Sequence, residues 1–408
     1  MAQEPSSEMF DQFYSLSSRG AYGELVRYIR DHDDEDVRYG AAGVLSESVS
    51  GFAEQMTPPV RKALVDVVLN DPSDAVRANV VKTLLAIDES IADNIITRLE
   101  IAPKSTPTDT PYPLLLTKWH ERQWPELRFL AVVGFGRVGS HTTIEKLRTT
   151  IQRETDLRVI RRAIEAGGTV GDETFVTPIK NYLRIDDESM YQSAEAEEIK
   201  RTKRAAVEAL VTLGTNGAYE ALHTASRGTD AELKACALSE IGRLEPDEAV
   251  DLIVDELHNG DDDVVREEAA EGLITTFTES DFEDGHTVRE QALAEMGDDV
   301  DAAVSAEFAS IVDESPRKPE QRNAAWVLTQ LGSTTEETVE SLLSALDDDD
   351  DYLRIIAAAG LTTLDPSLVE AKLEEFLASV DEESVAHNLA SSVRSNLQDG
   401  PEKVIWGS

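Results

Sequence analysis

The chain has 408 residues, of which 80 are acidic and 38 are basic, so its formal net charge at pH 7 is −42. A single cysteine, Cys236, excludes an internal disulfide, and no run of roughly 18 apolar residues is present, so we expect neither a membrane-spanning helix nor a membrane partner. Residues 1–10 have no basic start and no apolar core, so we expect no signal peptide and a cytoplasmic location.

A short motif recurs along the chain. It consists of an aliphatic residue, an arginine or lysine, a small residue three positions later and an apolar residue seven positions later. Clear copies centre on Arg38, Arg77, Arg128, Lys234, Arg266 and Arg354, weaker ones on Lys203, Gln321 and Ala386, and a degenerate one lies near Ile160. The shortest steps between copies are 31–33 residues. Self-similarity at such a period indicates a solenoid of stacked repeats.

Each copy predicts the second helix of a pair, because its apolar positions form one helical stripe. An amphipathic segment precedes most copies, as at residues 22–29, 60–69, 142–151, 249–257 and 339–346. Acidic turns separate the two segments and can cap the second helix, which glycines such as Gly136, Gly214 and Gly332 are suited to end. One pair cannot bury its stripe alone, so we predict an all-α superhelix of about ten helix pairs over residues 20–398.

Other segments depart from the repeat. Residues 1–19 are expected to form a short, partly ordered leader. Insertions are expected near 101–124, near 185–199 and near 279–298, the last with a short helix around 288–296. The tail, 399–408, contains Val404-Ile405-Trp406, which either caps the last repeat or docks on a partner. Insertions in a solenoid gather on one face, which is often the binding face.

The basic residue of the motif is unusual, because a cation in the first turn of a helix opposes the helix dipole. Its recurrence implies a compensating partner. We expect a turn carboxylate of the same or the adjacent repeat, which would give a ladder of charge-assisted hydrogen bonds along the chain.

With these motifs the chain resembles HEAT-repeat proteins, and specifically the short-repeat group named after the phycobilin lyases. The resemblance covers nearly all of residues 20–398 and implies the fold. It implies little about function, because the group includes lyases, hydroxylases and plain scaffolds. His120-Glu121 is a pair of the type that the iron-binding hydroxylases of the group use, but those enzymes carry several such pairs and this chain has one. We therefore expect no metal site, no cofactor and no catalytic residue.

Two further patterns invite a chemical interpretation. Gly134-Phe135-Gly136-Arg137-Val138-Gly139 matches the dinucleotide-binding fingerprint, yet it is the end of the motif copy at Arg128, and the flanking sequence is typical of helices. Acidic runs such as 347–351 lack the alternating ligands and central glycine of a calcium-binding EF-hand loop. We expect the glycine-rich stretch to be the end of a second helix, and the acidic run to be a solvated turn that also caps a helix. Cys236 is expected to be a small buried residue rather than a nucleophile.

Positive charge is concentrated in one part of the chain. Residues 118–162 contain ten basic and five acidic residues, and a second basic group lies at 200–204. Because the second helix of each pair usually lines the concave face in proteins resembling this one, we predict a partner-binding patch near the insertion at 101–124. Its candidate residues are Trp119, Trp124, Arg158, Arg161, Arg162, Lys200, Arg201 and Arg204. The alternative is local pairing of these cations with neighbouring acidic turns.

These observations favour a non-enzymatic scaffold or adaptor that binds a protein partner, through an acidic segment, on its concave face. The alternative is a nucleic-acid-binding protein similar to HEAT-like DNA glycosylases, although phosphate binding agrees poorly with the overall charge. A lyase-type enzyme is the third possibility, for which the motifs are missing.

The excess of carboxylates over lysines (12 Lys against 26 Arg) resembles the proteins of salt-accumulating halophiles. Salt near 1 M reduces the Debye length to about 3 Å and screens this repulsion. We therefore predict that helicity and melting temperature fall as KCl is removed, as measured by circular dichroism. Unchanged values near zero salt would contradict the prediction.

Overall fold

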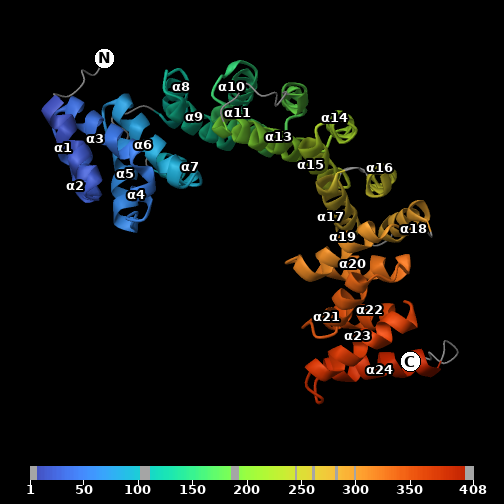
Figure 1. The fold of residues 1–408 in the computed structure, drawn as a ribbon. Helices are drawn as coiled ribbons and strands as arrows, with labels where there is room; N and C mark the ends of the chain where they lie inside the picture. Colours follow the sequence, from blue (N-terminus) through green and yellow to red (C-terminus); the bar gives the residue numbers. More distant parts are fainter. Residues whose placement is uncertain are drawn as a thin grey trace. The chain divides into compact units, whose positions relative to one another are not determined.

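The computed structural model describes residues 7–101, 111–184, 193–243, 246–259, 262–280, 284–297 and 300–399. Within these ranges every regular element is a helix (Figure 1), so the predicted all-α fold of repeated helix pairs is confirmed. None of the described helices is long and apolar enough to cross a membrane. The chain divides into two compact units, Met1–Leu213 and Gly214–Ser408.

In the first unit the helices are α1 (Ser7–Ser18), α2 (Tyr22–Asp31), α3 (Glu35–Glu47), α4 (Val49–Ala53), α5 (Pro58–Asn70), α6 (Asp74–Ile87), α7 (Ile91–Ile101), α8 (Tyr112–His120), α9 (Pro125–Val138), α10 (His141–Arg153), α11 (Leu157–Val170), η2 (Glu173–Phe175), α12 (Val176–Lys180), η3 (Asn181–Arg184) and α13 (Ser193–Leu213). The second helices of the pairs, α3, α6, α9, α11 and α13, pack against one another in sequence. The first helices, including α2, α5 and α10, cover one side of that row.

In the second unit the helices are α14 (Asn216–Ser226), α15 (Ala231–Ile241), α16 (Pro246–Asn259), α17 (Asp263–Glu279), α18 (Asp284–Met296), α19 (Ala302–Glu314), α20 (Lys318–Leu331), α21 (Glu336–Ala345), α22 (Asp351–Leu361), α23 (Pro366–Ser379) and α24 (Val385–Asp399). The row of second helices here is α15, α17, α20, α22 and α24. The helix expected around 288–296 is α18, which packs on α16.

The segments outside the regular repeat have different structures. The predicted leader contains α1, which packs on α2 and α3 and buries Phe13 and Leu16. The insertion near 101–124 contributes α8, which packs on α9. Residues 185–192 of the second insertion and the tail from 400 onward, including Val404-Ile405-Trp406, lie outside the described residues.

Capping follows the prediction with one correction. Asp34, Ser73 and Asp156 precede α3, α6 and α11, and each accepts a backbone N–H of the helix it precedes. Gly214 and Gly332 adopt positive φ, as the sequence suggested for helix ends. Gly136, by contrast, lies inside α9, and the left-handed cap of that helix is Gly139 with φ of 56°.

In six of the second helices the basic residue of the motif occupies the same helical position. It is the fourth residue after the N-cap of the second helix, and we call this the ladder position. It is held by Arg38, Arg77, Arg128, Lys234, Arg266 and Arg354, and by Ile160 and Gln321 in α11 and α20.

Arg38 shows what a ladder arginine does. Its Nε donates to Asp71 Oδ2 at 2.8 Å, across to the turn of the next pair, and both side chains are buried. Its Nη1 donates to the carbonyls of His32 and Asp33 at 2.9 Å each. Those carbonyls follow the end of α2, so the cation also lies at the negative end of a helix dipole, which offsets its unfavourable place in the first turn of α3.

Arg128 repeats the arrangement. It binds both oxygens of Glu154 in the next turn, at 2.7 and 2.9 Å, and it donates to the carbonyls of Arg122 and Gln123. Lys234 reaches Glu256 of α16 at 2.6 Å. The expected ladder of carboxylates from the same or adjacent repeat is therefore present.

Glycines allow the second helices to approach closely. A Cβ added at Gly272 of α17 would lie 2.4 Å from the carbonyl oxygen of Leu238 on α15, and one added at Gly168 of α11 would lie 2.9 Å from Cα of Ala209 on α13. Both neighbours are backbone atoms, so neither can move aside by changing a side-chain rotamer.

We predict that Gly272→Ala lowers the free energy of unfolding by about 1–3 kcal/mol, because the new methyl group overlaps a backbone carbonyl. Chemical denaturation measures the change. The control is Gly23→Ala on α2, where a Cβ would meet nothing within 4 Å. That variant should be as stable as the parent or more so. Equal behaviour of the two variants would contradict the close packing.

Candidate functional site

The predicted arginine cluster lies on α11, which packs between α9 and α13. Arg161 is 8% exposed and is surrounded by carboxylates. It donates to Glu198 at 2.6 Å, to Glu89 at 2.8 Å and to Glu165 at 3.0 Å. Burial alone would lower the pKa of Arg161, but the hydrogen bonds to Glu198 and Glu89 outweigh it and raise that pKa above its ordinary value.

Arg162 continues this ion-pair network. It donates to Asp93 of α7 at 2.8 Å and to Glu165 at 2.7 Å. Arg137 of α9 contacts the same Asp93 and also Glu100 of α7. The local excess of positive charge counted along residues 118–162 therefore meets carboxylates from α7 and α13, which lie outside that stretch of sequence.

Arg158 is half-buried. It donates to Asp156 at 2.8 Å, and its Nη2 lies 3.8 Å from Glu126. The hydrogen bond to Asp156 is the largest influence on the pKa of Arg158 and raises it above the ordinary value. The three arginines of α11 thus take part in local pairs, which is the alternative that the sequence left open. Binding of a partner at this place stays a prediction.

Lys200, Arg201 and Arg204 lie on α13 and are exposed. Arg201 pairs with Glu197 at 3.3 Å, one turn earlier, and 58% of each side chain is exposed. Lys200 and Arg204 also interact with their surroundings. Exposed ion pairs are worth little and exchange readily with other partners. Of the predicted basic residues, these three are the most accessible to another molecule.

The two tryptophans differ in exposure. Trp119 of α8 is 2% exposed, with the guanidinium of Arg77 6.0 Å from its ring centre. It therefore helps to pack α8 in the interior of the first unit and presents no ring to a partner. Trp124 is the N-cap residue of α9 and is partly exposed.

The residues that could have suggested catalysis or cofactor binding all lie in ordinary helix-packing contacts. His120 Nε2 lies 2.8 Å from Thr150 Oγ1, and the ring packs edge-on against Phe135. The glycine-rich stretch is the end of α9, where Gly134 and Gly136 accommodate Leu116 and Ala166. Cys236 is buried on α15. Among the described residues, no three His, Cys, Asp or Glu side chains are grouped so that they could hold a metal ion.

A family model for HEAT repeats matches residues 191–274. Residues 191–274 are therefore similar to HEAT repeats. The resemblance noted from the motif is thereby confirmed. The ladder arginines stabilise the contacts between successive helix pairs. A HEAT repeat-containing taxis protein of Halobacterium salinarum is 29% identical over 106 residues, which are 25% of this chain and 26% of the relative. The match thus spans about a quarter of the relative's length.

Solved structures with a similar fold are more distant in sequence. An engineered protein is 16% identical with a TM-score of 0.44, covering 93% of this chain and 99% of its own. The CpcE–CpcF complex of phycocyanin lyase from Nostoc is 17% identical with a TM-score of 0.34, covering 70% of this chain and 94% of its own. Similarities this low carry no statement about function.

Burial, with a smaller contribution from Lys146, lowers the pKa of His120 below its ordinary value. The unfolded chain then binds a proton at a pH where the folded protein does not. Stability should therefore fall as the pH drops from above about 6.5 through the lowered pKa of the folded state. We predict that His120→Gln, which can keep the hydrogen bond to Thr150, removes this part of the pH dependence. Denaturation of both proteins at several pH values tests this, and a stability difference that does not vary with pH would contradict it.

Proposed function

We propose that the protein is a non-enzymatic scaffold that binds a protein partner on the face lined by its second helices. In solenoid proteins each repeat is rotated slightly relative to the one before it, and the resulting curvature creates an extended concave binding surface. The proposal rests mainly on the observation that ion-paired arginines stabilise the packing of the repeats. In the described part of the chain, Arg128 of α9 and Arg161 and Arg162 of α11 lie in ion pairs with residues of other helices or turns, so these cations stabilise the stacking of the repeats.

The first contact surface that we propose is the exposed basic row of α13, formed by Lys200, Arg201 and Arg204, with an acidic segment of the partner as its complement. Trp124 and Arg158, which are partly exposed, extend the predicted patch from α9 and α11. Arg162 is also partly exposed, whereas Arg161 and Trp119 are buried, so we expect neither of these two to contact the partner directly. Since the matched Halobacterium relative is described as a taxis protein, taxis proteins are the first partners to test.

Triple charge reversal Lys200→Glu, Arg201→Glu and Arg204→Glu should weaken capture of the partner by tenfold or more, because complementary charge steers and holds the complex. The assay is affinity purification from the native host at native salt, followed by mass spectrometry with and without nuclease. The matched control reverses Arg19, Arg27 and Arg30, three exposed arginines of the same unit. Undiminished capture by the α13 variant would contradict the proposed surface, and material lost on nuclease treatment would favour nucleic acid instead.

A further inference from the structure

In the second unit, α20 lacks the ladder arginine. Its ladder position holds Gln321, the fourth residue after the N-cap Arg317. The carboxylate that such an arginine would reach is still present. Asp348 lies two residues before the N-cap Asp350 of the next second helix and accepts its backbone N–H. Asp71 and Glu154, the partners of Arg38 and Arg128, hold the same place relative to their N-caps and accept the equivalent backbone N–H.

Gln321 does not replace the missing cation. Asp348 binds Lys318 instead, at 2.7 Å, from the first residue of α20. Gln321 is 8% exposed, and its side-chain oxygen has no hydrogen-bond partner among the described residues. Leaving a buried amide oxygen without a donor destabilises the folded state. The position therefore offers an unused acceptor where other repeats place a guanidinium.

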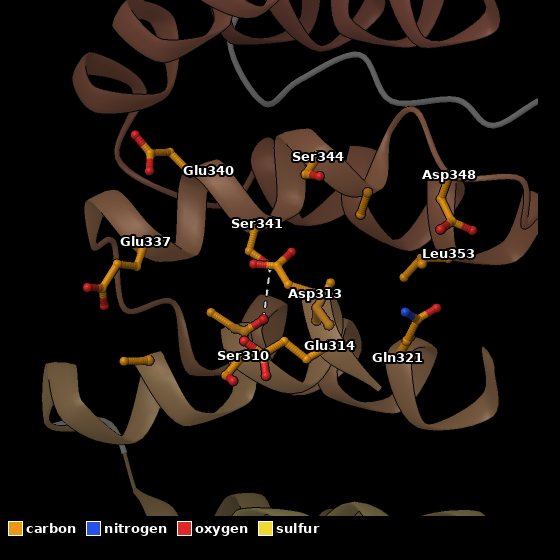
Figure 2. Close-up of a pocket in the computed structure, with 14 residues that line it drawn as sticks. Ser310, Asp313, Glu314, Gln321, Glu337, Glu340, Ser341, Ser344, Asp348 and Leu353 are labelled. Carbon is orange, nitrogen blue, oxygen red and sulfur yellow. Dashed lines mark hydrogen bonds between the residues drawn. The ribbon is translucent and has the colours of Figure 1, made fainter. Parts of the chain in front are cut away.

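An open cleft of about 610 Å³ lies at this position, between α19, α20, α21 and the start of α22 (Figure 2). Gln321 extends into it from α20, next to Leu353. Five carboxylates line the cleft, together with serine hydroxyls from α19 and α21. The acidic residues are Asp313, Glu314, Glu337, Glu340 and Asp348.

Only part of this negative charge is compensated. Asp348 pairs with Lys318, and Glu340 pairs with Lys372. Asp313, Glu314 and Glu337 have no ion pair in the described part of the chain. Asp313 is exposed and accepts a hydrogen bond from Ser341 at 3.1 Å. A cation that entered the cleft would reduce the repulsion among these carboxylates.

The arrangement suits an organic cation better than a metal ion, because no three of the described carboxylates converge on one point. A guanidinium carries five N–H donors in a plane, so it can serve the Gln321 oxygen and a carboxylate together. We propose that this cleft binds an arginine side chain supplied by the protein partner, which takes the place of the missing ladder arginine. The inference deepens the proposed scaffold function and rests on it for the source of the arginine.

The test uses the full chain and a capped tripeptide, acetyl-Ala-Arg-Ala-amide, with binding followed by NMR at a KCl concentration that keeps the protein folded. We expect saturable binding, and at least fivefold weaker binding of the lysine analogue and of spermidine. Gln321→Arg should fill the cleft from within, abolish tripeptide binding and raise the melting temperature. Gln321→Met keeps the size but removes the acceptor, and it should weaken binding about fivefold while remaining folded.

Three results would overturn the inference. They are no saturable binding of the arginine peptide to the parent protein, equal binding of the lysine peptide or spermidine, and unchanged binding by Gln321→Arg in a folded protein. None of these depends on capture of a partner through α13. Failure at the cleft and failure of the scaffold proposal are therefore distinguishable.

Discussion

One contact recurs between successive helix pairs, in which an arginine four residues into a second helix reaches a carboxylate in the turn of the next pair. Arg38 and Arg128 show it in full, with a carboxylate on one side and the carbonyls that follow the preceding helix on the other. Each of these two arginines therefore connects its own helix to the end of the preceding helix and to the turn of the next pair. Removing one partner of a buried pair leaves an uncompensated charge and costs about 3–5 kcal/mol.

This contact also compensates part of the negative charge of a chain whose net charge is −42. Several arginines lie between repeats, where they meet carboxylates. Many of the other carboxylates are exposed, where salt can screen them. Binding surfaces are therefore best sought where the arrangement changes, as on exposed α13 and beside Gln321.

The sequence predicted the helix pairs, their caps and the ladder partner, because periodicity and the helix dipole act over a few residues. It also explained the glycine-rich stretch as a helix end. It could not predict the partners of Arg161 and Arg162, because Glu89 and Asp93 lie 72 and 69 positions away and meet them only after stacking. Gln321 was visible in the sequence as a weak copy of the motif. That this weakness opens an acidic cleft required the positions of Asp313 and Asp348.

The central claim is that buried arginine–carboxylate pairs such as Arg38–Asp71 couple one repeat to the next. A double-mutant cycle at Arg38 and Asp71, with Arg38→Met, Asp71→Asn and the double variant, measures this coupling through the free energy of unfolding. The account predicts a coupling energy of about 2–3 kcal/mol, with the double variant more stable than the sum of the single changes implies. Effects that add to within about 0.5 kcal/mol would contradict it, since the two side chains would then not stabilise the fold through each other.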